Sequence, residues 1–455
     1  MNKKALKGIN VMRVVSGIRW RADPSTLMMV YKGIVRSHLD YGSQFIKPCP
    51  KQTLNKFDRT QYQALECAEM SLNQRRIWPT TKFILNIRST QDHPLSKILR
   101  ALKAHCDRKE GYWRSRDAPY PIEAMNKTDA FPNLYSSQLP PCFEYELPYQ
   151  LTPIAHINLD NTKADFLNNL DFLQMCKDRH RKETWIYTDG SLDSKQQKVG
   201  FGVYIPSIEY KFSSKLQKET QICTAEIIAI NHAICVCLEK NITNAIIWVD
   251  SKSAIERIKI QASRDYISLR TKRLLLEAGE NGTSITLGWI PGHFNIKGNH
   301  TADTLAKIGR DLNVPLDIKV DKKDILSIMR EQIRDQWNRQ WTTTLQNKGA
   351  AYRCLEANFP KKPWFSTMPF KDRRHLTTII KMRTDSPNCE CGQVGDLTHI
   401  ILECPINGIP GIDIYVSLSK AGNRTPMSIY TILRNINVES INILINFLNY
   451  NHINL

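Results

Sequence analysis

The sequence has 455 residues, of which 42% are hydrophobic, and a formal net charge of +19 at pH 7. The chain is too long for one ordinary domain and apolar enough to build real cores, so the composition excludes a disordered tail. Residues 1–115 and 319–383 are clearly basic, whereas the charges of residues 183–311 nearly cancel. We therefore expect a polyanionic partner that binds the basic flanks.

Neither export nor membrane insertion is indicated by the sequence. The N-terminal residues are basic and amphipathic, but they lack the continuous apolar core and the cleavage site of a secretory signal. No run of about 18 or more uncharged apolar residues is present to span a bilayer. We therefore expect an intracellular protein of the nucleus or cytoplasm, not secreted, whose partner is nucleic acid and not a membrane. No oligomeric state is indicated.

Residues 1–115 are predicted to be helical. Apolar residues recur there at the spacing of one helical face, namely Leu27, Val30, Tyr31, Ile34 and Val35. Prolines are dense between residues 119 and 153, and a proline removes a backbone donor that a helix needs. This density predicts a linker, or a connection that runs along the surface, without regular helix over residues 116–182.

Residues 183–311 show a pattern typical of a mixed α/β domain. The strands are predicted at 184–189, 199–205, 208–213, 244–251 and 284–291, and the helices at 223–240, within 251–280 and at 300–310. The predicted fold is a five-stranded mixed sheet with flanking helices, placed between mainly helical N- and C-terminal regions. The C-terminal region, residues 312–455, is basic and includes a group of cysteines with a histidine.

Two of the predicted central strands each end in an aspartate. Period two places Trp185, Tyr187 and Asp189 on one face of the first strand, and the later strand ends at Asp250. Ligands bind at the carboxyl ends of strands in open α/β sheets, so both carboxylates are candidates. Two local interpretations remain open. Asp189 before a glycine is also a hairpin-turn signal, and Asp250 could cap the helix that follows it.

Two further acidic residues lie on predicted helices. Glu226 shares its helical face with apolar residues, namely Ile222, Ala229, Ile230 and Ala233. This pattern places the Glu226 carboxylate against the sheet. Asp303 lies near the start of the last helix, where an interaction with the helix dipole would also account for it. His293, in the loop before that helix, could assist proton movement or product release, or could simply be solvated.

Four carboxylates at one edge of a sheet repel one another unless cations bind between them. Two Mg²⁺ ions about 3.5 to 4 Å apart would neutralise this charge and form a clamp for in-line displacement at phosphorus. Hard oxygen ligands favour Mg²⁺ or Mn²⁺ over zinc. The sequence therefore predicts a two-metal site made of Asp189, Glu226, Asp250 and Asp303.

These motifs resemble type 1 ribonuclease H. The resemblance rests on TDGS at 188–191, TAE at 224–226, VDS at 249–251, WIPGH at 289–293 and GNHTAD at 298–303, in the order and spacing of that family. It implies metal-binding carboxylates at the four acidic positions and a mobile histidine at His293. The implied activity is endonucleolytic cleavage of the RNA strand in an RNA–DNA hybrid, which is recognised through its 2′ hydroxyls. GFG at 200–202 is interpreted as tight packing of a strand, not as a phosphate loop.

The flanks show a second resemblance. GIRW at 17–20 and YKGIVRSHLDYGSQF at 31–45 are similar to the segment that follows the polymerase palm in reverse transcriptases of non-LTR retrotransposons. CECGQVGDLTHIILECP at 389–405 resembles the cysteine and histidine cluster that follows ribonuclease H in those elements. No tyrosine followed by paired aspartates occurs. We therefore expect the C-terminal portion of such a polyprotein, with a thumb-like region at 1–115 and no polymerase activity.

A possible zinc site lies in the C-terminal region. Cys389, Cys391, His399 and Cys404 supply three thiolates and one imidazole, which suit a closed tetrahedral structural zinc. The first two cysteines are closer in sequence than usual, so a packed, metal-free cluster remains open as well. Basic residues just upstream would suit phosphate contacts or form a solvated face, namely Arg373, Arg374, Lys381 and Arg383.

Two other functions fit parts of this pattern. Transposases and integrases share the sheet, but their glutamate follows the second aspartate, whereas Glu226 lies between Asp189 and Asp250. An inactive retroelement remnant would only bind nucleic acid through its basic flanks, and the intact carboxylates argue against it. The predicted function is therefore a metal-dependent ribonuclease that acts on RNA–DNA hybrids.

Overall fold

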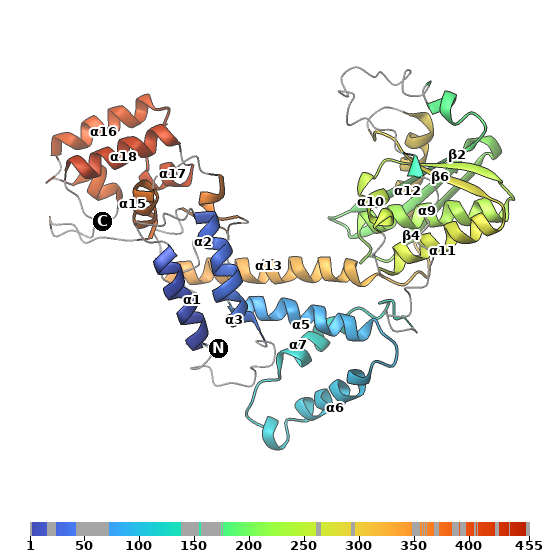
Figure 1. Cartoon of the computed structure of the whole chain (residues 1–455), viewed down its shortest axis with the longest axis horizontal. Coiled ribbons are helices and arrows are strands. Elements are labelled where there is room, and N and C mark those ends of the chain that lie inside the picture. The colour runs from blue at the N-terminus through green and yellow to red at the C-terminus, as the bar shows by residue number, and fades with distance from the viewer. Residues whose placement is uncertain are drawn as a thin grey trace. The chain divides into compact units, whose positions relative to one another are not determined.

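The computed structural model describes most of the chain and divides it into two compact units. The described residues are 2–15, 24–41, 72–137, 154–155, 174, 176–260, 265–292, 296–347, 355–356, 358, 360, 362–367, 373–384, 391, 397–404, 406, 408–423, 427–435 and 437–451. The first unit comprises residues 1–80, 115–120 and 331–455, and the second comprises residues 81–114 and 121–330. Figure 1 shows the chain coloured by residue number.

The first unit is helical in its described residues. Its helices are α1 (Asn2–Val15), α2 (Pro24–Val30), α3 (Ser37–Asp40), α15 (Arg373–Thr384), α16 (Gly408–Lys420), α17 (Ile429–Arg434) and α18 (Val438–Tyr450), with π-helical turns at Tyr31–Arg36 and His399–Glu403 and a 3-10 turn at Trp364–Thr367. Helices α5 (Leu72–Arg88) and α13 (Lys322–Asn347) have residues in both units. The prediction of helical flanks is therefore confirmed for the described residues.

Apolar residues form two cores in the described part of this unit. One contains Met28, Tyr31, Val35 and Leu39. Ile34, which was predicted on the same face, is 40% exposed. The buried residues recur every three or four positions, so the buried face is centred on Met28, Tyr31 and Val35, and Ile34 lies beside it. The other core joins α16, α17 and α18, which are drawn in red in Figure 1.

The second unit is built on a six-stranded mixed sheet. Its strands are β1 (Ile154–Ala155), β2 (Thr184–Asp193), β3 (Lys198–Ile205), β4 (Tyr210–Leu216), β5 (Asn244–Val249) and β6 (Ser284–Trp289). They lie in the order β1-β6-β5-β2-β3-β4. The pairs of β2 with β5 and of β5 with β6 are parallel, whereas β3 pairs antiparallel with β2 and with β4. The predicted five-stranded mixed sheet is confirmed, and β1 adds a two-residue edge.

Helices cover both faces of this sheet. The helices that follow β4 in the chain are α9 (Ile222–Glu239), α10 (Lys252–Lys259), α11 (Tyr266–Glu280) and α12 (Lys297–Asp311). Residues of α9, α10 and α11 form the largest apolar core together with Ile186 of β2. The next residue, Tyr187, points to the opposite face, where it packs with Trp248 and with Ala302 of α12. The sheet is therefore a central layer, with α9, α10 and α11 on one face and α12 on the other.

Strand β2 continues through the Asp-Gly pair that also resembled a turn. Asp189, Gly190 and Ser191 pair with Gly202, Phe201 and Gly200 of β3. The strand ends only at Asp193, and the connection to β3 lies at residues 194–197. The hairpin-turn interpretation of Asp189 and Gly190 is therefore wrong, because the antiparallel partner β3 extends the strand beyond its parallel partner β5.

The proline-rich segment contains a helix that the sequence analysis excluded. Helix α7 runs from Tyr120 to Thr128, and α6 (Pro94–Arg108) precedes it. Pro121 lies in the first turn of α7, where a backbone N–H has no partner within the helix, so a proline is tolerated there. Beyond α7, Phe131 and Leu134 pack against Val320, Ile325 and Met329. Part of the predicted linker is thus packed inside the second unit.

Helix α9 is long and apolar enough to cross a membrane by length and composition, but 67% of it is buried inside the protein. It contributes most of the apolar residues on one face of the sheet. A fully apolar helix of this kind is typical of the core of a soluble domain as well as of a membrane span. Its burial here accounts for its composition.

Candidate functional site

Three of the four predicted carboxylates lie together at one edge of the sheet. Oxygen atoms of Asp189, Glu226 and Asp250 all lie within 4.8 Å of one another. We call these three residues the carboxylate cluster. Asp189 lies in β2, Glu226 in the second turn of α9, and Asp250 directly after β5. Three elements that are distant in sequence therefore bring one acidic group each to the same place.

The sheet register explains why Asp189 and Asp250 meet. The parallel pairing of β2 with β5 ends at Thr188 and Val249, so each aspartate is the next residue after the last pair. Their parallel strands place the two carboxylates at a common edge. Asp189 is held on its other side by its antiparallel partner Gly202. The position of Asp189 is thus determined by its own pairing with β3 and by the pairing of the preceding residue, Thr188, with β5.

Gly190 allows α9 to approach this edge. A Cβ atom at Gly190 would lie 3.0 Å from the backbone nitrogen of Glu226 and 3.1 Å from the side chain of Ala225. These distances are shorter than nearly all real Cβ contacts, so a side chain at this position would push the start of α9 away from β2. The glycine of the Asp-Gly pair therefore serves close packing and not a turn.

Asp250 is not the cap of the helix that follows it. Ser251 takes that role, because its hydroxyl oxygen accepts a hydrogen bond from the backbone N–H of Ala254 at 3.3 Å. The Asp250 backbone carbonyl accepts a hydrogen bond from the Trp289 indole at 2.9 Å. Its carboxylate accepts one from the Asn299 amide at 3.4 Å. Trp289 thus holds the backbone of Asp250, and Asn299 contacts its carboxylate.

Asp303 approaches the cluster from α12 without joining it. It is the seventh residue of a helix that begins at Lys297, so it lies beyond the first turn and the helix-dipole interpretation is wrong. Its carboxylate pairs with Lys307 at 2.6 Å. Gly202 lets α12 come this close, because a Cβ atom there would lie 2.5 Å from the Ala302 carbonyl oxygen. The interpretation of GFG at 200–202 as tight packing is confirmed.

Burial and mutual repulsion perturb the acidity of the cluster. Burial, together with the negative charges of Asp250 and Asp303, raises the pKa of Asp189 to about 8. Burial and the charges of Asp189 and Asp250 also raise the pKa of Glu226 well above its usual range. The Glu226 Oε2 atom is buried without a hydrogen-bond partner in the described structure. These features fit a divalent cation, which would supply the missing positive charge to hard oxygen ligands.

Sequence analysis missed one contributor to this site. The amide of Asn299 contacts the Asp250 carboxylate, and its side chain is buried. It lies within GNHTAD at 298–303, but nothing in its own pattern distinguished it from a helix-start asparagine. His293, the predicted mobile histidine, falls in residues 293–295 and lies outside the described residues.

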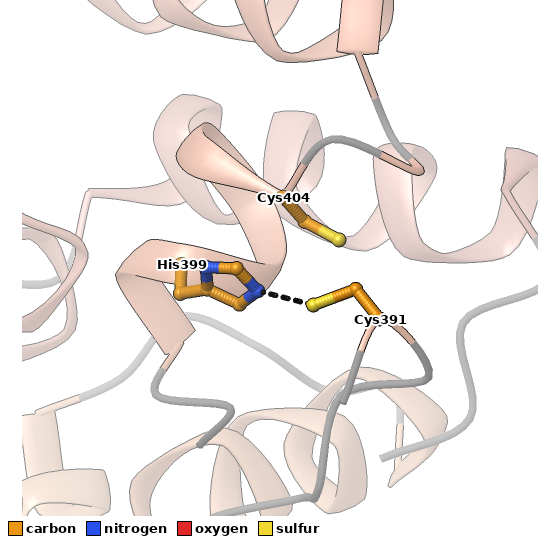
Figure 2. Close-up of side chains that lie close together, drawn as sticks. All are labelled: Cys391, His399 and Cys404. Atoms are coloured by element: carbon orange, nitrogen blue, oxygen red, sulfur yellow. Dashed lines mark hydrogen bonds between the residues drawn. The ribbon is translucent and has the colours of Figure 1, made fainter. Parts of the chain in front are cut away.

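A second group of ligand-type side chains lies in the first unit. Atoms of Cys391, His399 and Cys404 lie within 4.8 Å of one another, and we call them the Cys/His cluster. Figure 2 shows both sulfur atoms near the His399 ring, with a 3.1 Å contact between Cys391 Sγ and His399 Nε2. His399 and Cys404 are buried. The fourth predicted ligand, Cys389, lies outside the described residues.

Of the four basic residues predicted before this cluster, Arg383 has a described side chain, and it is buried. Arg383 is 3% exposed, and its guanidinium donates to the Leu433 carbonyl at 2.7 Å and to Glu356 at 2.9 Å. It also lies over the Trp364 ring, 4.8 Å from the centroid. Both interpretations of Arg383, as a phosphate contact or as part of a solvated face, are wrong because it is a buried structural residue. The side chains of Arg373, Arg374 and Lys381 lie outside the described residues.

Comparison with known proteins identifies the domain that contains the carboxylates. Residues 181–311 match the model of the ribonuclease H family (RNase H), with nearly the bounds predicted for the α/β domain. A search of curated proteins finds no match to this sequence. The chain therefore contains a ribonuclease H domain, which supports ribonuclease activity on RNA–DNA hybrids. All four predicted carboxylates lie inside the matched segment.

Proposed function

We propose that this chain is an endoribonuclease that hydrolyses the RNA strand of RNA–DNA hybrids with two bound Mg²⁺ or Mn²⁺ ions. The observation that carries the proposal is the carboxylate cluster, whose oxygen atoms lie within 4.8 Å of one another inside a ribonuclease H domain. The raised pKa values of Asp189 and Glu226 support it, because such mutual repulsion is relieved when a cation binds.

The proposed roles follow from the positions of the side chains. Asp189, Glu226, Asp250 and Asp303 would hold the ions, which when bound activate a water molecule and stabilise the leaving 3′ oxygen. The Asn299 amide donates to Asp250 and so orients its carboxylate. Lys307 pairs with the Asp303 carboxylate one helical turn away. His293 is proposed to assist proton movement or product release.

Binding of the hybrid is proposed to depend on the basic flanks. Between Asp250 and β6 the described residues contain only α10 and α11, which pack on the sheet. The net positive charge of the chain lies instead in residues 1–115 and 319–383. Lysine and arginine contacts to phosphates release counterions, so this binding should weaken as the salt concentration rises.

The nuclease proposal is tested by cleavage of a labelled hybrid. Purified full-length protein with Mg²⁺ should shorten the RNA strand, and Asp189→Asn should reduce the rate by about 100-fold or more, because it removes a charge at the reacting centre. Asp193→Asn is the matched control. Asp193 ends the same strand and is only partly buried, and an asparagine there keeps the oxygen that accepts from the backbone N–H groups of Lys195 and Gln196. Uncleaved hybrid that is retarded on a gel would instead indicate a protein that only binds nucleic acid.

We further infer that the chain is the C-terminal portion of a non-LTR retrotransposon polyprotein, active inside the cell in the nucleus or cytoplasm. Support comes from the resemblance of residues 17–45 and 389–405 to those elements and from the basic flanks. A primer-extension assay should detect no DNA synthesis by the protein that cleaves hybrids. DNA synthesis by the pure chain would contradict the absence of a polymerase palm.

We also propose that the Cys/His cluster binds a structural zinc ion, with Cys389 as the fourth ligand. Thiolates and an imidazole are the ligands that zinc prefers, and three of them already converge. The Cys391–His399 contact at 3.1 Å would otherwise be a simple hydrogen bond in a metal-free cluster. Elemental analysis of the full chain should find one zinc, and Cys404→Ser should lose it.

A suitable control for the zinc measurement is Cys237→Ser. Cys237 is a residue of α9, and its thiol is buried in the apolar core of the other unit, so its loss should leave the zinc content unchanged. The proposal would be contradicted if the full-length protein contained no zinc after purification and took up none when zinc was added. The Cys/His cluster would then be metal-free.

A further inference from the structure

A buried polar network holds the first turn of α9 and includes residues beyond the ribonuclease H match. The Thr224 hydroxyl donates a hydrogen bond to Asp324 Oδ1 at 2.8 Å. Arg257 Nη1 donates to the same hydroxyl oxygen at 2.8 Å. Thr224 and Asp324 are each 2% exposed. A threonine in the turn that leads to Glu226 is therefore held between one acidic and one basic side chain.

We propose that Asp324 is a positioning residue that acts through Thr224 to hold Glu226 in place. Asp324 lies at the start of α13, whereas the matched segment ends at residue 311. Residues 320–330 would then form part of the nuclease, although they lie outside the segment that carries its motifs. This inference rests on the proposed nuclease function.

The start of α13 is anchored independently of α9. Asp321 Oδ1 accepts a hydrogen bond from the Lys323 backbone N–H at 2.7 Å. On the apolar side of the helix, Ile325 and Met329 pack in a core with Leu85. The turn that contains Asp324 therefore has polar and apolar contacts of its own. These contacts hold Asp324 in place, so that it can in turn hold Thr224.

A second layer of charges fixes the Arg257 side of the network. Arg257 Nη2 donates to Asp265 Oδ1 at 3.0 Å, and Lys323 Nζ donates to Asp265 Oδ2 at 2.7 Å. Asp265 also caps α11, because it accepts from the Ser268 backbone N–H at 3.0 Å. The two cations and the buried acids thus join the starts of α9, α11 and α13 through α10. Charge-assisted hydrogen bonds of this kind are short and directional.

The position of this turn decides where Glu226 lies. Glu226 follows Thr224 by two residues, and its backbone nitrogen is already in close packing with Gly190 of β2. A small displacement of the turn would therefore change the separation between Glu226 and the other two carboxylates. Misplacement of a catalytic group by about 1 Å can reduce a rate by about 100-fold. Asp324 would accordingly affect the reaction without touching substrate or metal.

The test compares substitutions at Asp324 in the full-length protein. Asp324→Ala removes the acceptor for Thr224 and should lower kcat about tenfold or more, with KM for the hybrid within about twofold of wild type. The Mg²⁺ concentration for half-maximal rate should rise. Asp324→Asn keeps an acceptor oxygen and should restore kcat to within about threefold of wild type. Asp317→Asn is the control, because Asp317 is 91% exposed on the preceding segment.

A second pair of variants tests the same bond from its other end. Thr224→Val removes the hydroxyl with little change in volume, whereas Thr224→Ser keeps it. Should Asp324→Ala fail to fold, this pair decides, because only the variant without a hydroxyl should lose activity. A kcat within about twofold of wild type for both Asp324→Ala and Thr224→Val would overturn the proposal. Equal loss in Asp324→Ala and Asp324→Asn would also overturn it.

Calorimetric titration with Mg²⁺ separates this inference from the nuclease proposal. Wild-type protein that binds Mg²⁺ but does not cut the hybrid would contradict the nuclease proposal alone. Weaker Mg²⁺ binding in Asp324→Ala than in Asp324→Asn would then still support the positioning role. Identical Mg²⁺ binding in wild type and Asp324→Ala would refute it, and wild-type protein that neither cuts nor binds Mg²⁺ would refute both.

Discussion

The carboxylate cluster and the Cys/His cluster are two ligand sets built in different ways. The acids come from β2, α9 and the end of β5, and each of these elements has extensive packing of its own. The Cys/His cluster lies within residues 391–404, around one π-helical turn. The first geometry is therefore formed by the sheet before any metal binds, whereas the second would gain much of its order from the metal.

The largest effect should follow from Glu226→Gln. Cleavage should fall by about 100-fold or more, because a charged ligand is lost at the reacting centre. The metal-free protein should nevertheless melt at a higher temperature, since a buried carboxylate without a partner is replaced by a neutral amide. Hybrid cleavage and thermal melting without Mg²⁺ measure the two effects.

Glu239→Gln provides the matched control for this substitution. Glu239 lies at the exposed end of the same helix, so neither cleavage nor melting should change appreciably. A lower melting temperature for Glu226→Gln would show that the sheet does not hold the acids against their repulsion, and would weaken the contrast between the two ligand sets.

Removal of zinc should destabilise the first unit and spare the reaction. Structural zinc sites contribute on the order of 10 kcal/mol to the folding of small domains, so chelation should lower one calorimetric transition strongly. Cleavage by the ribonuclease H domain should remain within about threefold, because its core does not depend on that metal. Scanning calorimetry with and without a zinc chelator, with Mg²⁺ restored for the assay, measures both. A chelator that changes neither transition would show that the Cys/His cluster folds without metal.

Gly202→Ala should weaken the packing that brings Asp303 to the site. The new Cβ atom would lie 2.5 Å from backbone atoms of α12, so the helix must shift. Overpacking of this kind costs about 1–3 kcal/mol, which chemical denaturation can measure. Gly279→Ala is the matched control: no atom lies within 4 Å of a Cβ at that helical position, so stability should rise by about 0.5–1 kcal/mol. Equal effects of the two substitutions would contradict the close approach of α12.

A smaller effect should appear in the pH dependence of stability. The pKa of Asp324 is raised to about 7, because burial and the charge of Asp321 raise it more than the hydrogen bond from Thr224 and the charge of Arg257 lower it. A raised pKa means that the folded state holds the proton more tightly, so this stabilisation is complete below about pH 4 and is lost as pH rises to about 7. Asp324→Asn should remove that dependence, which amounts to at most about 1.4 kcal/mol per pH unit.

Denaturation curves at several pH values with saturating Mg²⁺ would measure this difference, because bound metal suppresses the titration of Asp189 and Glu226. The free energy of unfolding of Asp324→Asn, measured relative to that of the wild type, should increase between pH 5 and 7. A difference in the free energy of unfolding that is constant over this range would contradict the prediction. It would show that Asp324 is already ionised at low pH, because Arg257 compensates its charge more strongly than burial disfavours it.

Local patterns predicted the elements of the ribonuclease H domain well and the regions around it less well. The strands and helices between Thr184 and Asp311 were anticipated because each repeats its apolar residues with a clear period. Helix α7 was missed because proline was judged by its density and not by its place in the first turn. Ile34 was wrongly predicted on the buried face because the apolar residues between 27 and 35 cover more of the helix than the side that packs, which is centred on Met28, Tyr31 and Val35.

By itself, the sequence determined the mixed α/β domain and its acidic residues, because periodicity and the order of motifs are local properties. Only the tertiary structure decided that Asp189 lies within a strand, that Ser251 and not Asp250 caps α10, and that Arg383 is buried. It alone joined Thr224 to Asp324, across 100 residues of sequence. Such contacts depend on how helices pack against a sheet, and no pattern within one segment records the neighbour that another segment will supply.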